Sequence, residues 1–226
     1  MDHSIQEDVA IPAGQAELYG RLDVPTGAQG IVVFAHGSGS SRFSPRNQEV
    51  AAALQKDGLG TLLFDLLTER EAAIDAKTRQ HRFDIPLLVK RLIEVTDWLQ
   101  QQESTRPLNI GYFGASTGAA AALGAAAVRK QEVKAFVSRG GRPDLADDAL
   151  TQVDAPTLLI VGGLDTAVIG MNQAARERMP GVTQLVLVEG ATHLFEEPGT
   201  MEQVTRHANA WFQRYLVPGN SVRPSA

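Results

Sequence analysis

The stretch Gly114-Ala115-Ser116-Thr117-Gly118 decides the fold, because of the residues on either side of it. The apolar run 108–113 precedes it, and the alanine-rich segment 119–128 follows it. This order predicts a buried strand, a sharp turn and a helix, with Ser116 at the turn. Glycines two residues before and after the serine avoid side-chain collisions in so tight a turn. A serine at such a turn, facing the positive end of a helix dipole, is typical of a nucleophile.

Further apolar runs and helical patterns extend outward from this turn in both directions. The runs cover residues 31–34, 61–64, 108–113, 133–137, 157–161 and 184–188. Such continuous runs are typical of strands buried on both faces of a parallel sheet. Residues 4–11 and 16–24 instead alternate around Pro12-Ala13-Gly14, which predicts an antiparallel hairpin. Helical patterns lie between the runs, over 45–58, 88–99, 117–128 and 200–216. Strands that alternate with helices predict an α/β fold.

The bulk composition limits the class of protein. A chain of 226 residues suffices for one large domain, which we expect over residues 1–217, with a flexible tail over 218–226. The net charge of −5 argues against nucleic acid as a main partner. No apolar run approaches the roughly 20 residues that a membrane helix needs, so no membrane association is expected. The absence of cysteine excludes disulfides, thiolate metal sites and a cysteine nucleophile. The acidic, polar residues 1–8 do not resemble a secretory signal, so we expect a cytoplasmic protein.

Residues that directly follow the predicted strands are the candidates for function, because ligands of parallel sheets bind beyond the carboxyl ends of the strands. The small, glycine-rich segment 35–41 follows the first buried run. We predict that the Ser38 N–H of this loop and the Thr117 N–H form an oxyanion hole. The alternative is a simple flexible turn. His36, at the start of the loop, is interpreted as structural rather than as a catalytic base.

Two further candidates complete a catalytic set with Ser116. Asp165 follows the run 157–161, where a carboxylate can orient a histidine; the alternative is an N-cap for a helix that begins at Thr166. His193 lies in the loop after the run 184–188, where an ordinary surface or core histidine is the alternative. The chain order Ser116, Asp165, His193 favours a triad in which His193 takes the serine proton and Asp165 fixes the imidazole.

Arginines also gather near the predicted strand ends. They are Arg42, Arg46, Arg82, Arg139 and Arg142. Among them, Arg42 and Arg139 are candidates for contacts with a carboxylate or phosphate of the substrate. The alternative, which we favour, is ion pairing with carboxylates such as Asp65, Glu69, Glu71 or Asp144.

The chain resembles the α/β-hydrolases and is most similar to the dienelactone hydrolase-like group. The resemblance lies in segments 36–41, 111–118, 155–165 and 190–196, and it extends over about residues 4–216. It implies an eight-stranded, mostly parallel sheet with helices on both faces, whose second strand runs antiparallel to the rest. The chain has no insertion long enough for the separate helical cap domain of many α/β-hydrolases. Dienelactone hydrolases proper use a cysteine nucleophile at the position of Ser116.

The sequence therefore predicts a serine hydrolase that cleaves a carboxylic ester or lactone of a small molecule through an acyl-enzyme on Ser116. An amidase or thioesterase with the same triad is an alternative, as is a non-catalytic small-molecule binding protein on a hydrolase scaffold. No cofactor or metal is expected, and the sequence does not decide whether the protein forms a homodimer. We expect loops 66–82 and 140–150 to leave an open, shallow site that favours short acyl groups. In the competing arrangement, segment 66–82 folds down as an apolar cover.

Overall fold

The structure, a computed structural model, describes residues 4–219 of the chain. Its elements in chain order are β1 (Ile5–Ala13), β2 (Ala16–Val24), β3 (Gly30–Ala35), α1 (Pro45–Lys56), β4 (Gly60–Phe64), α2 (Glu69–Thr78), α3 (Ile85–Gln101), β5 (Asn109–Ala115), α4 (Thr117–Val128), β6 (Val133–Arg139), the 3-10 helix η1 (Pro143–Gln152), β7 (Thr157–Gly162), α5 (Thr166–Arg178), β8 (Thr183–Val188) and α6 (Thr200–Leu216). Most of the predicted tail, from residue 220 onward, lies outside the described residues.

The strands form one eight-stranded sheet in the order β1-β2-β4-β3-β5-β6-β7-β8. β2 runs antiparallel to both of its neighbours, and every other pairing from β3 to β8 is parallel. This confirms the predicted sheet and its antiparallel second strand. The predicted hairpin is also present, but β1 continues through Pro12, and the turn follows Ala13. Proline is tolerated there because β1 is an edge strand.

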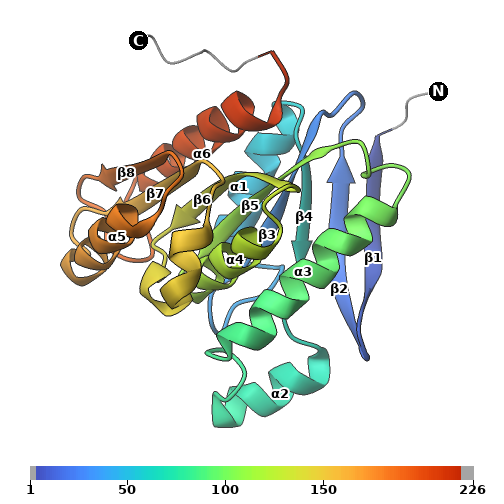
Figure 1. The fold of residues 1–226 in the computed structure, drawn as a ribbon, viewed down its shortest axis with the longest axis horizontal. Helices are drawn as coiled ribbons and strands as arrows, with labels where there is room; N and C mark the ends of the chain where they lie inside the picture. Colours follow the sequence, from blue (N-terminus) through green and yellow to red (C-terminus); the bar gives the residue numbers. More distant parts are fainter. Residues whose placement is uncertain (1–3, 220–226) are drawn as a thin grey trace.

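Helices cover both faces of the sheet (Figure 1). α1 and α6 pack on one face, where Phe34, Phe113 and Phe212 are fully or almost fully buried. α3, α4 and η1 pack on the other face, around Tyr112 and Phe136. α4 is rich in alanine, and its small side chains let it lie close to the sheet. The result is a three-layer α/β arrangement with a core on each side of the sheet.

Segment 69–78 differs from the expected loop, because it forms the helix α2 beyond one end of the sheet (Figure 1). A capping box starts this helix: the Glu71 N–H donates to Thr68 Oγ1, and the Thr68 N–H donates to the Glu71 carboxylate. Segment 143–152 likewise forms the 3-10 helix η1. Within residues 4–219, no helix is both long and apolar enough to cross a membrane.

Candidate active site

Ser116 lies at the turn between β5 and α4, as the sequence predicted. Its backbone has φ 49° and ψ −122°, a conformation that non-glycine residues rarely adopt. Three hydrogen bonds hold this strained residue: Ser116 N to Arg139 O at 3.2 Å, and Ala119 N and Arg142 N to Ser116 O, each at 3.1 Å. Strain of this kind persists only where the surrounding structure enforces it, and it is common at active sites.

The flanking glycines are required by the space around the turn. A Cβ on Gly114 would lie 2.5 Å from Ala119 Cα. A Cβ on Gly118 would lie 2.2 Å from Ala35 O and 2.4 Å from His36 O. These backbone atoms cannot move aside without displacing α4, β3 or the loop that follows β3. The close approach of α4 to that loop therefore places the loop beside Ser116.

The structure brings Asp165 and His193 together. Asp165 Oδ2 lies 2.7 Å from His193 Nδ1, so Nδ1 carries a hydrogen that it donates to the carboxylate, and Nε2 is left as the free nitrogen. Asp165 precedes α5, but its side chain makes no capping hydrogen bond to the helix. The helix-cap alternative is thus wrong for the side chain, because the carboxylate turns toward His193 instead.

The loop that carries His193 is fixed by its own contacts. The Glu197 carboxylate accepts hydrogen bonds from the Thr192 N–H at 3.1 Å and from Thr192 Oγ1 at 2.6 Å. Phe195 is buried, with a positive φ of 55°. These two anchors lie on either side of His193 and limit the movement of its backbone.

His193 and Ser116 approach the same segment, residues 139–142. Arg139 O and the Arg142 N–H hold the Ser116 backbone, and a Cβ on Gly140 would lie 3.5 Å from His193 Nδ1. Among the described residues, the Ser116 hydroxyl makes no hydrogen bond to His193. Hydrogen bonds between catalytic groups are often long without substrate and shorten when it binds.

The predicted oxyanion donors lie next to each other, but one is already occupied. The Ser38 N–H donates to Thr117 Oγ1 at 2.9 Å. The Thr117 N–H lies in the first turn of α4, where backbone donors have no partner within the helix. The loop therefore sits where the sequence predicted, with the Thr117 hydroxyl as the present acceptor of the Ser38 N–H.

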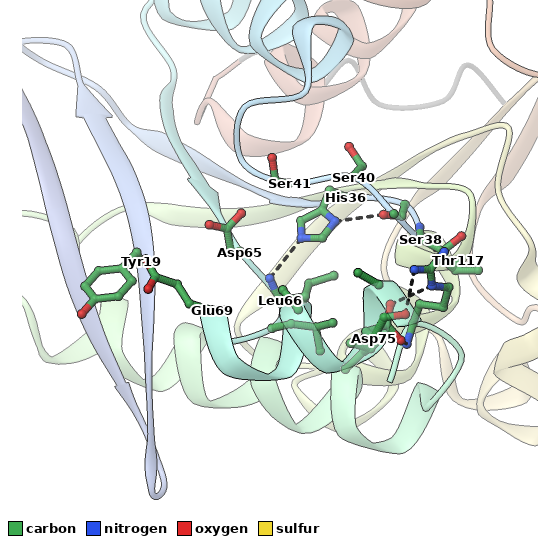
Figure 2. Close-up of a pocket in the computed structure, with 17 residues that line it drawn as sticks. Tyr19, His36, Ser38, Ser40, Ser41, Asp65, Leu66, Glu69, Asp75 and Thr117 are labelled. Atoms are coloured by element: carbon green, nitrogen blue, oxygen red, sulfur yellow. Dashed lines mark hydrogen bonds and ion pairs between the residues drawn. The ribbon is translucent and has the colours of Figure 1, made fainter. Parts of the chain in front are cut away.

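His36 anchors this loop through both ring nitrogens (Figure 2). Nε2 accepts from the Leu66 N–H at 3.1 Å, so Nδ1 must carry the hydrogen that it donates to Gly37 O at 2.9 Å. Burial lowers the pKa of His36, and Gly37 O and the Asp65 carboxylate only partly oppose this. A neutral imidazole with both nitrogens engaged agrees with the structural interpretation of His36.

Four of the five arginines near the strand ends form ion pairs, which is the alternative that we favoured. The pairs are Arg42 with Asp65, Arg46 with Glu196, Arg82 with Asp75 and Arg142 with Asp144. Asp65 and Asp144 were expected partners, whereas Asp75 and Glu196 were not.

Arg139 is the exception among these arginines. It is buried, and within residues 4–219 no carboxylate lies within ion-pair distance of it. Its Nη1 contacts Met201 Sδ at 3.8 Å. Burial, with the charge of Arg46, lowers the pKa of Arg139 to about 10. A buried guanidinium without an anionic partner is a candidate anion contact.

α2 lines one side of a cavity of about 300 Å³ beside the loop 35–41 (Figure 2). Leu66, Leu67, Ala72 and Ala76 are among the residues that line it. Ala72 and Ala76 are exposed, as are Ile74 and Phe83, so segment 66–82 forms one wall of the cavity and does not close over it as an apolar cover. The preference for short acyl groups stays a prediction. Within residues 4–219, no group of three or more His, Asp or Glu residues could hold a metal ion.

Comparisons with known proteins agree with this architecture. The family described as "Alpha/beta hydrolase domain" matches residues 28–213. The crystal structure of a dienelactone hydrolase from Anabaena variabilis superimposes with a TM-score of 0.93 and 55% identity, over 94% of this chain and 99% of that chain. Est1E from Butyrivibrio proteoclasticus has a TM-score of 0.77 at 17% identity, over 92% of this chain and 98% of that chain, and shows a likeness of fold alone.

Curated relatives from two strains of Mycobacterium tuberculosis share 57% identity with the chain over 216 residues. Both are provisionally named phosphoribosyl transferases. The match covers 95% of this chain but 48% of the relatives, so the chain spans about half of their length.

Proposed function

Because this chain belongs to the α/β-hydrolase family and is dienelactone hydrolase-like, we propose that it is a serine hydrolase of small-molecule carboxylic esters or lactones. One observation carries the proposal. The Asp165 carboxylate binds His193 Nδ1 at 2.7 Å beside a segment that holds a strained Ser116. That arrangement engages His193 Nδ1 and leaves Nε2 as the nitrogen available to act as a base.

In the proposed reaction, His193 Nε2 takes the hydroxyl proton of Ser116 as Ser116 Oγ bonds to the substrate acyl carbon. The carbonyl oxygen gains negative charge, and the bond to the leaving oxygen then breaks as His193 returns the proton to it. Water attacks the acyl-enzyme in turn, gives a proton to His193 and releases the acid, and Ser116 regains its hydrogen. Asp165 stabilises the imidazolium during both half-reactions.

We assign the Thr117 and Ser38 N–H groups to the developing oxyanion. The Ser38 N–H can serve only if the Thr117 hydroxyl gives way to the substrate oxygen, since it now accepts that hydrogen. Removing one such donor costs about 2.7–4 kcal/mol of transition-state stabilisation in a known protease. Arg139 is the stronger candidate for an anionic part of the substrate, because Arg42 is paired with Asp65.

Steady-state hydrolysis of p-nitrophenyl acetate and butyrate tests the proposal. We expect Ser116→Ala and His193→Ala each to lower kcat/KM by at least about 10³-fold, because triad members act as a unit. Ser4→Ala and His207→Ala are matched controls, since both residues lie outside the proposed site. A Ser116→Ala variant with wild-type activity would contradict the proposal, as would a wild-type protein without activity on any ester, thioester or amide.

The phosphoribosyl transferase name belongs to relatives about twice as long as this chain. The segment that they share with it carries the hydrolase family match over residues 28–213. The proposal of ester hydrolysis therefore rests on this chain's own site and does not extend to the remaining half of those relatives.

A further inference from the structure

The cavity under α2 extends from the oxyanion loop toward β2. Ser38 and Thr117 line one end, and Tyr19 and Glu69 line the other (Figure 2). Its volume, about 300 Å³, lies at the lower end of the range for small-molecule sites. A group that enters from the oxyanion hole would thus reach toward Glu69.

The position of the cavity decides which half of an ester can occupy it. Ser38 and Thr117 line the cavity, whereas Ser116, Asp165 and His193 do not, so the cavity begins beside the nucleophile on the side of the oxyanion donors. His193 must lie within reach of the leaving oxygen to return a proton to it, so the leaving group belongs on the His193 side. The acyl group is then directed to the other side of the oxyanion donors, into the cavity.

The charges around the cavity are predominantly negative. Three carboxylates line it, from Asp65, Glu69 and Asp75, together with a single arginine, Arg82. The Arg82 Nε–H donates to Asp75 Oδ2 at 2.7 Å, so this pair carries no net charge. Arg42 neutralises Asp65 from outside the lining. Within residues 4–219, Glu69 forms no ion pair. Its side chain is exposed in the first turn of α2, so its charge is reduced by the helix dipole and by water but has no cationic partner at the Tyr19 end.

The apolar part of the wall suits a hydrocarbon chain. Leu66 and Leu88 are almost fully buried and line the cavity with Leu67. Ala72 and Ala76, one turn apart on α2, line it from the helix side. Each methylene of an acyl chain that leaves water here favours binding, so the cavity favours chains that fill it.

We propose that this cavity binds the acyl group of the substrate, and that the far end of that group is uncharged or cationic rather than anionic. The inference deepens the proposed function and rests on it. The competing arrangement uses Arg82, since a Cβ on Gly39 would lie 3.5 Å from its Nη1, and Nη1 could meet an acyl carboxylate instead. Under that arrangement an anionic acyl group would be preferred.

Matched p-nitrophenyl esters with different charges at the far end of the acyl chain separate these possibilities. The neutral ester is the heptanoate, the anionic ester is the mono-ester of adipate, and the cationic ester is the 5-(trimethylammonio)pentanoate. All three share one leaving group, so only the acyl end differs. We expect kcat/KM for the neutral and cationic esters to exceed that for the anionic ester by about two- to fivefold, as an exposed carboxylate allows. This difference should shrink at high salt because part of the cavity is open to solvent.

Glu69→Gln tests the source of the discrimination. We expect it to raise kcat/KM for the anionic ester and to lower it for the cationic one, without affecting the neutral ester. Glu177→Gln is the matched control: it makes the same charge change on α5, away from the cavity. Equal or preferred turnover of the anionic ester, with Ser116 labelled by a fluorophosphonate, would overturn the inference alone. No turnover of any ester, with Ser116 unlabelled, would overturn the proposed function and the inference with it.

A second pair of variants tests whether the acyl group occupies the cavity at all. Ala72→Phe places a ring in the cavity, whereas Ala73→Phe places the same ring on an exposed part of α2 outside the cavity lining. We expect Ala72→Phe to reduce the ratio of kcat/KM for hexanoate to that for acetate by about tenfold. Ala73→Phe should leave this ratio unchanged. An equal effect of the two substitutions would contradict acyl binding under α2.

Discussion

Gly118→Ala is the substitution that most severely perturbs the turn around Ser116. The added Cβ would lie 2.2 Å from Ala35 O and 2.4 Å from His36 O. The first distance is about 1 Å shorter than the closest ordinary carbon–oxygen contacts, which are about 3.3 Å. Both oxygens belong to the backbone at the end of β3, so no side chain can rotate away to relieve the clash.

The expected loss of unfolding free energy follows from this geometry. Overpacking by one methyl group costs about 1–3 kcal/mol where side chains can adjust, and more where they cannot. We therefore expect Gly118→Ala to lower the free energy of unfolding by at least about 3 kcal/mol. For a chain of this length, that corresponds to a fall in Tm of about 6–12 °C.

Thermal and urea unfolding measure this change directly. Gly170→Ala is the matched control, because Gly170 lies in α5 with nothing within 4 Å of an added Cβ. Alanine favours a helix over glycine by up to about 1 kcal/mol, so Gly170→Ala should leave the Tm unchanged or raise it slightly. A Gly118→Ala protein as stable as the wild type would refute the close approach of α4 to the loop 35–41.

Three further predictions concern charged and titratable groups. Burial lowers the pKa of His36 in the folded protein below its usual 6.5, so the unfolded chain binds a proton on this imidazole at a higher pH than the folded chain does. The free energy of unfolding is therefore highest above about pH 6.5 and falls as the pH drops below that value. His36→Gln should reduce the loss of unfolding free energy between pH 7.5 and pH 5.0, measured by urea titration. A variant that loses as much stability as the wild type over this interval would contradict a pKa shift of His36. Arg91→Met removes hydrogen bonds to Ala13 O and Glu71, each 2.9 Å long. It should lower the free energy of unfolding by about 1–3 kcal/mol and speed amide hydrogen exchange in α2, because Glu71 lies in that helix. Unaltered exchange in α2 would show that Arg91 does not hold the helix in place. Arg139→Met should not lower the Tm, since no carboxylate partner is lost, and a drop of several degrees would reveal an unrecognised structural role.

The strands and the Asp165–His193 pair could be predicted because their signals are local. Parallel strands buried on both faces give continuous apolar runs, and the carboxyl ends of such strands meet at one edge. The positions that follow β7 and β8 are therefore neighbours in space, although Asp165 and His193 lie 28 residues apart in the chain. Their positions directly after two predicted strands, together with the chain order Ser116, Asp165, His193, sufficed to pair them.

α2 could not be predicted from its apolar pattern, because Asp75 is its only buried residue. The signal that was present is the capping box, a threonine at position 68 followed by a glutamate at position 71. The acceptor of the Ser38 N–H, Thr117 Oγ1, lies 79 residues away and depends on how closely α4 approaches the loop. The ion pair of Arg46 with Glu196 likewise joins residues 150 positions apart, whereas Arg82 and Asp75 are seven positions apart and their pair depends on α2.

Covalent labelling of the folded protein with a fluorophosphonate, followed by intact mass and peptide mapping, tests whether Ser116 is the nucleophile. We expect one adduct per chain, on the peptide that contains Ser116, with no adduct in Ser116→Ala. We also expect labelling to be at least about 10³-fold slower in His193→Ala, because the imidazole activates the serine. A folded wild-type protein that stays unlabelled, or that carries its adduct on another residue, would contradict the assignment of Ser116 as the nucleophile.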